Sequence, residues 1–233
     1  METHSYDAIV IGGGHNGLTC AAYLGKRGLR VLVLERRNVL GGAAVTEEFH
    51  PGFRNSVFSY LVSLLDRRVV AELELPRHGL ELIPRPGGGL SLLPGDHFHL
   101  APDVPAAQRA LERFSKADAR AYPAFDTMLQ EIGNLVRQIA QDIPPNFGGG
   151  LADLWRLLQS ANGFRRLSAE RQLQLTELMT MSVGDFLDRW FESDPIKGLF
   201  GFEGIIGNFA GAYEPGSAYV LLHHAFGNVD GNT

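Results

Sequence analysis

Cysteine is almost absent from this sequence: Cys20 is the only one in 233 residues. A single thiol cannot build an intrachain disulfide framework, and without a C-x-x-C pair the chain does not have the motif of a dithiol reductase. We expect a reducing compartment, with Cys20 packed as a small apolar residue in the first helix. No apolar run reaches the roughly 18 residues of a membrane span, and no secretory signal is visible. These absences predict a cytoplasmic protein.

Positive charge is also scarce, since 21 Lys and Arg face 26 Asp and Glu and leave a net charge of −5. Without a strong basic field the chain is not expected to bind nucleic acid. No catalytic triad, cysteine–histidine pair, paired carboxylate or cluster of metal ligands is evident from the spacing. We therefore expect no metal site and look for chemistry that a cofactor supplies.

A glycine-rich turn follows the first apolar run, which predicts a strand over residues 7–11. Gly12 permits a tight turn, Gly14 lets the backbone approach a pyrophosphate, and Gly17 lets a helix pack closely on the strand. The helix, expected over residues 16–27, would then direct free N–H groups at the phosphates. The turn predicts five cofactor-binding residues: Gly12, Gly13, Gly14, Asn16 and Gly17.

A second apolar run, residues 30–34, ends at Glu35, whose carboxylate can accept hydrogen bonds from ribose hydroxyls. Strand, glycine turn, helix, strand and acid occur in the order that a dinucleotide-binding fold requires. The fold class is therefore α/β, with an FAD/NAD(P)-binding Rossmann-like parallel sheet. The continuous apolar character of both strands predicts a sheet that is covered on both faces.

A glycine pair, Gly41–Gly42, follows soon after the acid. This spacing resembles the FAD-binding amine-oxidase and phytoene-desaturase superfamily. The resemblance implies that Glu35 holds the adenosine ribose and that the glycine pair passes close to FAD. Ala43 stands where the family often has an arginine, so the phosphate or flavin contact of that arginine is missing or comes from elsewhere. The resemblance adds five predicted cofactor-binding residues: Arg36, Arg37, Gly41, Gly42 and Ala43.

Four further segments, which begin at Leu75, Ser115, Gly204 and Pro215, are similar to phytoene-desaturase-like proteins. That resemblance implies a longer protein whose sheet has about five or six strands. We therefore expect an N-terminal portion that is inactive in isolation. Residues 1–75 would belong to the FAD-binding domain, and residues 76–233 to a substrate or cap region that is incomplete at its C-terminus.

The predicted cap begins with short strands over residues 80–83, 90–93 and 97–100, and is mostly helical from Pro105. Ser115 and Asp118 form a predicted capping box before a long helix, in which Pro123 should cause a kink or a later start. Asn162–Gly163 should stop the next helix. Later helices are expected over residues 168–179, 183–191 and after 195. Seven apolar residues form one helical stripe: Tyr122, Phe125, Leu129, Ile132, Val136, Ile139 and Ile143.

Catalytic side chains are not identified by any motif. His223 and His224 are weak candidates for a proton-relaying group near the flavin, while Phe58 and Tyr60 can line the flavin or pack in the core. We expect hydride transfer from an apolar, isoprenoid- or lipid-like substrate to FAD. An NAD(P)-dependent dehydrogenase and a non-catalytic nucleotide- or lipid-binding protein remain alternatives. Peripheral membrane contact and a homo-oligomer are compatible with the sequence.

Overall fold

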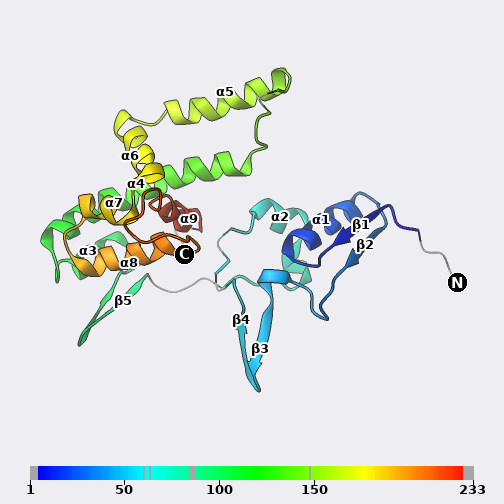
Figure 1. The fold of residues 1–233 in the computed structure, drawn as a ribbon, viewed down its shortest axis with the longest axis horizontal. Coiled ribbons are helices and arrows are strands. Elements are labelled where there is room, and N and C mark those ends of the chain that lie inside the picture. Colours follow the sequence, from blue (N-terminus) through cyan, green and yellow to red (C-terminus); the bar gives the residue numbers. More distant parts are fainter. Residues whose placement is uncertain (1–4, 60, 63, 84–87, 147, 228–233) are drawn as a thin grey trace. The chain divides into compact units, whose positions relative to one another are not determined.

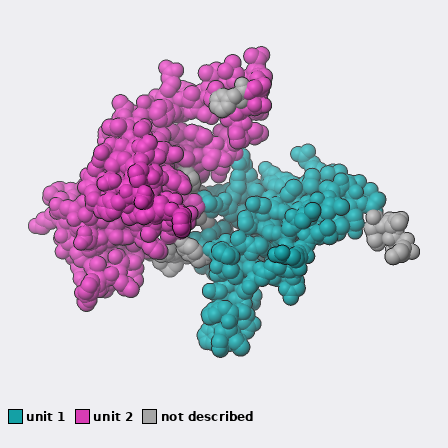
Figure 2. Space-filling model, in the orientation of Figure 1, with its two compact units in different colours: residues 1–83 teal, residues 84–233 magenta. Residues whose placement is uncertain are grey.

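The computed structural model describes residues 5–59, 61–62, 64–83, 88–146 and 148–227 (Figure 1). The chain divides into two compact units, residues 1–83 and residues 84–233 (Figure 2). The boundary expected between residues 75 and 76 falls inside the first unit, in the short helix η2 (Leu75–His78). Along the described chain, no helix is long and apolar enough to cross a membrane.

The first unit begins with the predicted strand–helix–strand segment. Strand β1 (Ala8–Ile11) pairs in parallel with β2 (Val31–Leu34), and α1 (His15–Lys26) connects them. Val10 faces α1, whereas Ile9 and Ile11 point to the other face and are 59% and 87% exposed. Within the first unit the expected cover on both faces is therefore wrong, because no described element of this unit lies over that second face. Cys20 is exposed rather than packed.

A β-hairpin follows in the segment that the sequence predicts to be irregular. Strand β3 (Thr46–His50) pairs antiparallel with β4 (Phe53–Ser56), after the short helix η1 (Gly42–Ala44). Gly52 adopts a φ of 81° in the turn, and its N–H donates to the Glu48 carboxylate at 2.7 Å. The missed hairpin has its turn at Pro51–Gly52, a pair of residues typical of turns. Helix α2 (Arg67–Glu72) follows it.

The second unit is mostly helical, as predicted. One of the three expected strands is wrong, because residues 80–83 form no strand, and the other two pair as an antiparallel hairpin. Helix α5 continues through Asn162–Gly163 instead of stopping there. The elements of this unit are β5 (Leu90–Leu93), β6 (Asp96–His99), α3 (Val104–Leu111), α4 (Lys116–Gln141), α5 (Leu151–Arg165), α6 (Ala169–Thr180), α7 (Val183–Trp190), α8 (Asp194–Ile205) and α9 (Val220–Gly227).

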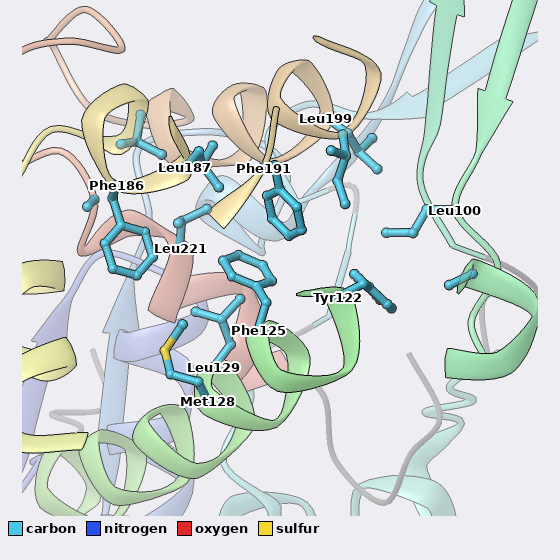
Figure 3. Packing of buried hydrophobic residues seen from close by; sticks show 14 of the residues in the cluster. Leu100, Tyr122, Phe125, Met128, Leu129, Phe186, Leu187, Phe191, Leu199 and Leu221 are labelled. Atoms are coloured by element: carbon cyan, nitrogen blue, oxygen red, sulfur yellow. The ribbon is translucent and has the colours of Figure 1, made fainter. Parts of the chain in front are cut away.

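The core of the second unit centres on Phe125 of α4 (Figure 3). Its ring is fully buried and meets the rings of Trp190, Phe191 and Phe200 edge-on, with centroids 5.4, 4.8 and 5.0 Å away. The predicted stripe along α4 is buried or half-buried as far as Val136. Beyond it, Ile139 and Ile143 are 43% and 69% exposed, so the C-terminal part of the stripe does not belong to this core.

The start of α4 shows how a proline is accommodated inside a helix. Ser115 caps the helix, since its Oγ accepts from the N–H groups of residues 117 and 118 at 3.1 Å. The predicted alternative that the helix starts only after Pro123 is wrong, because Pro123 lies inside α4. Proline has no N–H for the carbonyl of Ala119, four residues earlier. Gln108 of α3 donates its side-chain N–H to that carbonyl at 2.8 Å instead.

Replacing Gln108 with alanine is therefore expected to lower the free energy of unfolding by about 1 kcal/mol, because the carbonyl of Ala119 loses its donor. In a Pro123→Ala background the same replacement should cost much less, since residue 123 then donates to Ala119 itself. Urea denaturation of the four proteins in this double-mutant cycle measures the coupling. An equal loss in the free energy of unfolding in both backgrounds would show that Gln108 does not substitute for the missing N–H of Pro123.

Candidate functional site

The glycine turn between β1 and α1 is shaped by two glycines that the fold itself requires. Gly12 has a φ of 103°, a conformation that other residues rarely adopt, and its N–H donates to the carbonyl of Leu34 at 2.8 Å. At Gly17, a Cβ atom would lie 2.1 Å from the carbonyl oxygen of Gly12. A side chain at Gly12 would therefore strain the backbone of the turn, and one at Gly17 would disturb the packing of α1 against it.

Gly14 is different, because the protein's own packing does not require a glycine there. Its φ of −77° and ψ of 172° suit any residue, and an added Cβ would meet only the Cα of Gly42, at 3.6 Å. No side chain caps α1, and its first turn contains no acidic residue. The first N–H groups of a helix have no partner within the helix and carry a partial positive charge. The space beside Gly14 is thus suited to the close approach of an anion such as a pyrophosphate.

The glycine pair at residues 41–42 packs directly against this turn. Gly41 donates its N–H to the carbonyl of Gly13 at 2.8 Å and forms an isolated β-bridge with Gly14. Gly42 has a φ of 59°, and a Cβ on it would lie 2.8 Å from the Cα of Gly14. The glycine turn (residues 12–17) and the glycine pair (residues 41–42) therefore lie against each other and form one continuous backbone surface, which we call the wall. Their direct contact could not be read from the spacing alone.

Glu35 lies against the same wall. Its Oε2 accepts from the N–H of Gly13 at 2.7 Å, and its Oε1 accepts from the N–H of Arg37 at 2.9 Å. These backbone donors, Arg37 first and Gly13 second, hold the pKa of the Glu35 carboxyl below its ordinary value. An ionised carboxylate has about four acceptor positions, so acceptor capacity remains for ribose hydroxyls.

The other predicted cofactor-binding residues surround this wall. Asn16 is exposed in the first turn of α1, and the side chain of Arg36 is exposed. The guanidinium of Arg37 pairs with Glu47 of β3 and is engaged within the unit. Ala43 is exposed, and its carbonyl accepts from the hydroxyl of Ser59 at 3.3 Å.

The catalytic candidates are not part of this wall. His223 lies on α9 in the second unit, and its side chain is exposed. Phe58, in the first unit, is exposed, which favours neither of its two predicted roles. The side chain of His224 and all of Tyr60 lie outside the described residues. In the described ranges, no group of three or more His, Cys, Asp or Glu residues is placed to hold a metal ion.

Comparison with known proteins agrees with the geometry of the first unit. A family model described as "NAD(P)-binding Rossmann-like domain" matches residues 10–69. Pyridine nucleotide-disulfide oxidoreductase domain-containing protein 2 from Rattus norvegicus is 38% identical over 97% of this chain and 42% of its own length. A limonene dehydrogenase polypeptide from Castellaniella defragrans is 40% identical over 52% of this chain and 22% of its own length.

The fold is shared with solved structures of putrescine oxidase. A triple mutant of that enzyme matches with a TM-score of 0.56 at 16% identity, covering 96% of this chain and 43% of the other. This chain thus spans less than half the length of the relatives from rat and Castellaniella and of the oxidase. The names of all three describe oxidoreductases. Over 97% of its length the chain is therefore similar to part of pyridine nucleotide-disulfide oxidoreductase domain-containing protein 2, and its residues 10–69 match the NAD(P)-binding Rossmann-like domain.

Proposed function

We propose that this chain supplies the adenosine- and pyrophosphate-binding part of an FAD-dependent oxidoreductase. The observation that carries the proposal is the wall formed by residues 12–17 and 41–42, with the carboxylate of Glu35 beside it. The turn and the start of α1 would hold the pyrophosphate, and Glu35 would hold the adenosine ribose. Gly14 fits this assignment, because its open side leaves room for the phosphates.

The proposed reaction is oxidation of an apolar, isoprenoid- or lipid-like substrate. FAD would accept the hydride, and the residues of the chain would bind the cofactor, orient it and exclude water. The resemblance to phytoene-desaturase-like proteins supports an apolar substrate, and so does the name of the limonene dehydrogenase relative, since limonene is an apolar isoprenoid. The reaction is proposed for the whole protein, and we expect the 233-residue chain alone to be inactive.

NAD⁺ is the second candidate ligand, because the matching family model is described as binding NAD(P). Glu35 disfavours NADP⁺, since its carboxylate would repel a 2′-phosphate. Titration of the purified chain with FAD, followed by flavin fluorescence, with NAD⁺ and NADP⁺ as competitors, tests the assignment. We expect FAD to bind more tightly than either nucleotide. Tighter binding of NAD⁺ would replace the flavin proposal with a nicotinamide one.

Replacing Glu35 with alanine should weaken FAD binding by about 10- to 100-fold, because hydrogen bonds to a charged group are lost. Glu35→Gln keeps one carbonyl oxygen and should therefore lose less affinity for FAD than Glu35→Ala. Calorimetric titration with ADP, which carries the same ribose, should show the same ranking, while inorganic pyrophosphate should bind equally to all three proteins. An unchanged dissociation constant for ADP in Glu35→Ala would assign Glu35 to the fold alone.

The same site predicts a pH dependence. The pKa of Glu35 is lowered from an ordinary value of 4.5, so the folded protein keeps the carboxylate ionised below that pH. The affinity for ADP relative to pyrophosphate should thus stay constant as the pH falls from neutral to 4.5, and decline only as the pH passes the lowered pKa. A decline centred at or above pH 4.5 would contradict the hydrogen bonds that Gly13 and Arg37 donate to Glu35.

A further inference from the structure

Helix α5 exposes an apolar stripe along one side. Leu151, Leu154, Trp155 and Leu158 follow the i, i+3, i+4, i+7 spacing that places side chains on one helix face. They are 86%, 53%, 62% and 53% exposed. In the described structure none of the residues of α5 is buried. Such a face is costly in water and indicates a surface that binds something apolar.

The stripe borders a groove between α5 and the C-terminal part of α4, which lie in the same unit (Figure 1). The groove has a volume of about 710 Å³. Trp155 and Leu158 line it from α5, and Leu135 and Ile139 line it from α4. Its size is within the range that encloses a small ligand or a chain of similar bulk.

Positive charge lies at one end of the groove. Arg165 and Arg166 line it, are exposed and form no ion pair with any described residue. Arg156 pairs with Asp153 at 2.8 Å and is therefore neutralised. Residues 135–166 contain four arginines and two aspartates, a net charge of +2, within a chain whose net charge is −5. The apolar stripe thus ends in the basic part of an acidic protein.

We propose that α5 docks this unit on an anionic lipid surface. Acyl chains would cover the leucine stripe and fill the mouth of the groove. Trp155 would lie at the boundary between headgroups and hydrocarbon, which tryptophan favours. Arg165 and Arg166 would contact anionic headgroups while their methylene stems cover apolar surface. An anionic membrane matches both the apolar stripe and the charge at its end, and a single exposed helix needs no partner of complementary shape to bind it.

Tryptophan fluorescence tests the proposal directly, because the chain has only Trp155 and Trp190. Trp190→Phe leaves Trp155 as the sole reporter on the stripe, and Trp155→Phe leaves Trp190 beside Phe125 in the core. Vesicles of phosphatidylcholine with phosphatidylglycerol should shift the emission of Trp155 to the blue, and brominated lipids should quench it. The emission of Trp190 should not change. Pure phosphatidylcholine should give a much weaker response.

Sedimentation of the unlabelled chain with the same vesicles separates the two parts of the proposal. Arg165→Gln with Arg166→Gln should weaken binding roughly 30-fold, since each arginine near an anionic surface contributes about fivefold. Leu154→Gln with Leu158→Gln should weaken it at least tenfold. Matched controls lie on other exposed surfaces of the same unit: Arg109→Gln with Arg120→Gln, and Leu92→Gln on β5. These controls should bind as the unchanged chain does.

Three results would overturn the proposal. The first is the absence of sedimentation and of a blue shift with anionic vesicles. The second is a blue shift of Trp155 that appears without lipid as the protein concentration rises, which would assign the stripe to a second copy of the chain. The third is equal losses in the glutamine variants and in their matched controls, which would likewise exclude α5 as the contact.

Discussion

Replacing Gly14 with valine is expected to abolish FAD binding, a loss of at least 100-fold, while the chain stays folded. The backbone conformation at Gly14 suits a side chain, and its Cβ would meet no protein atom closer than 3.6 Å. The branched side chain would instead occupy the space in which a pyrophosphate approaches the turn. Its cost to folding should be limited to about 1 kcal/mol, the usual penalty for a poor residue at a helix N-cap.

The matched control is Gly25→Val in the same helix, where an added Cβ meets nothing within 4 Å. This variant should bind FAD normally. Flavin fluorescence measures binding, and circular dichroism establishes that each variant is folded. If Gly14→Val does not fold, Gly14→Ala provides the smaller test, since its Cβ fits the protein and still intrudes on the phosphates. Full FAD binding by folded Gly14→Val would place the pyrophosphate elsewhere.

The three glycines of the motif illustrate what the sequence can predict. Their spacing correctly assigns a tight turn to Gly12 and close helix packing to Gly17, because both roles follow from the backbone alone. The ligand-binding role of Gly14 stays a prediction. The contact of Gly41 and Gly42 with the turn depends on how the chain returns after β2, so no local pattern contains it.

Errors in the element predictions have equally local causes. The stop at Asn162–Gly163 is absent because the following residues continue the helix to Arg165, and a glycine inside a helix costs only about 1 kcal/mol. Pro123 remains inside α4 because a residue of α3 satisfies the carbonyl that the proline leaves free. The predicted strand over residues 80–83 had suitable side chains, but strands need a partner, and the described chain supplies none there.

The buried polar contacts could not be predicted from the capping motif. The sequence assigns Asp118 to a capping box with Ser115, yet its carboxylate accepts from the N–H groups of Glu192 and Ser193, both at 2.9 Å. These donors lie just before α8, more than 70 residues away in the chain. A capping box predicts local hydrogen bonds from both of its residues. Here Ser115 forms its local bonds, whereas the carboxylate of Asp118 makes tertiary contacts instead.

Replacing Phe125 with alanine is expected to cause the largest loss of stability in the second unit, about 3–5 kcal/mol. The ring is fully buried and meets three other aromatic side chains from α7, α8 and the residue that follows α7. Alanine would remove these contacts and leave a cavity that rigid neighbouring rings cannot close. Edge-on ring pairs also contribute beyond the area they bury, so the upper part of the range is expected.

Urea denaturation of Phe125→Ala, followed by the fluorescence of Trp190 in a Trp155→Phe background, measures this loss. Trp190 is a suitable reporter because its ring lies 5.4 Å from that of Phe125, in the centre of the core. Phe209→Ala is the matched control, since that ring is fully exposed, and it should change the free energy of unfolding by less than about 0.5 kcal/mol. A loss below about 1 kcal/mol at Phe125 would mean that the core relaxes around the cavity. The helices around Phe125 would then not form the rigid substrate-covering region that the proposed oxidoreductase requires.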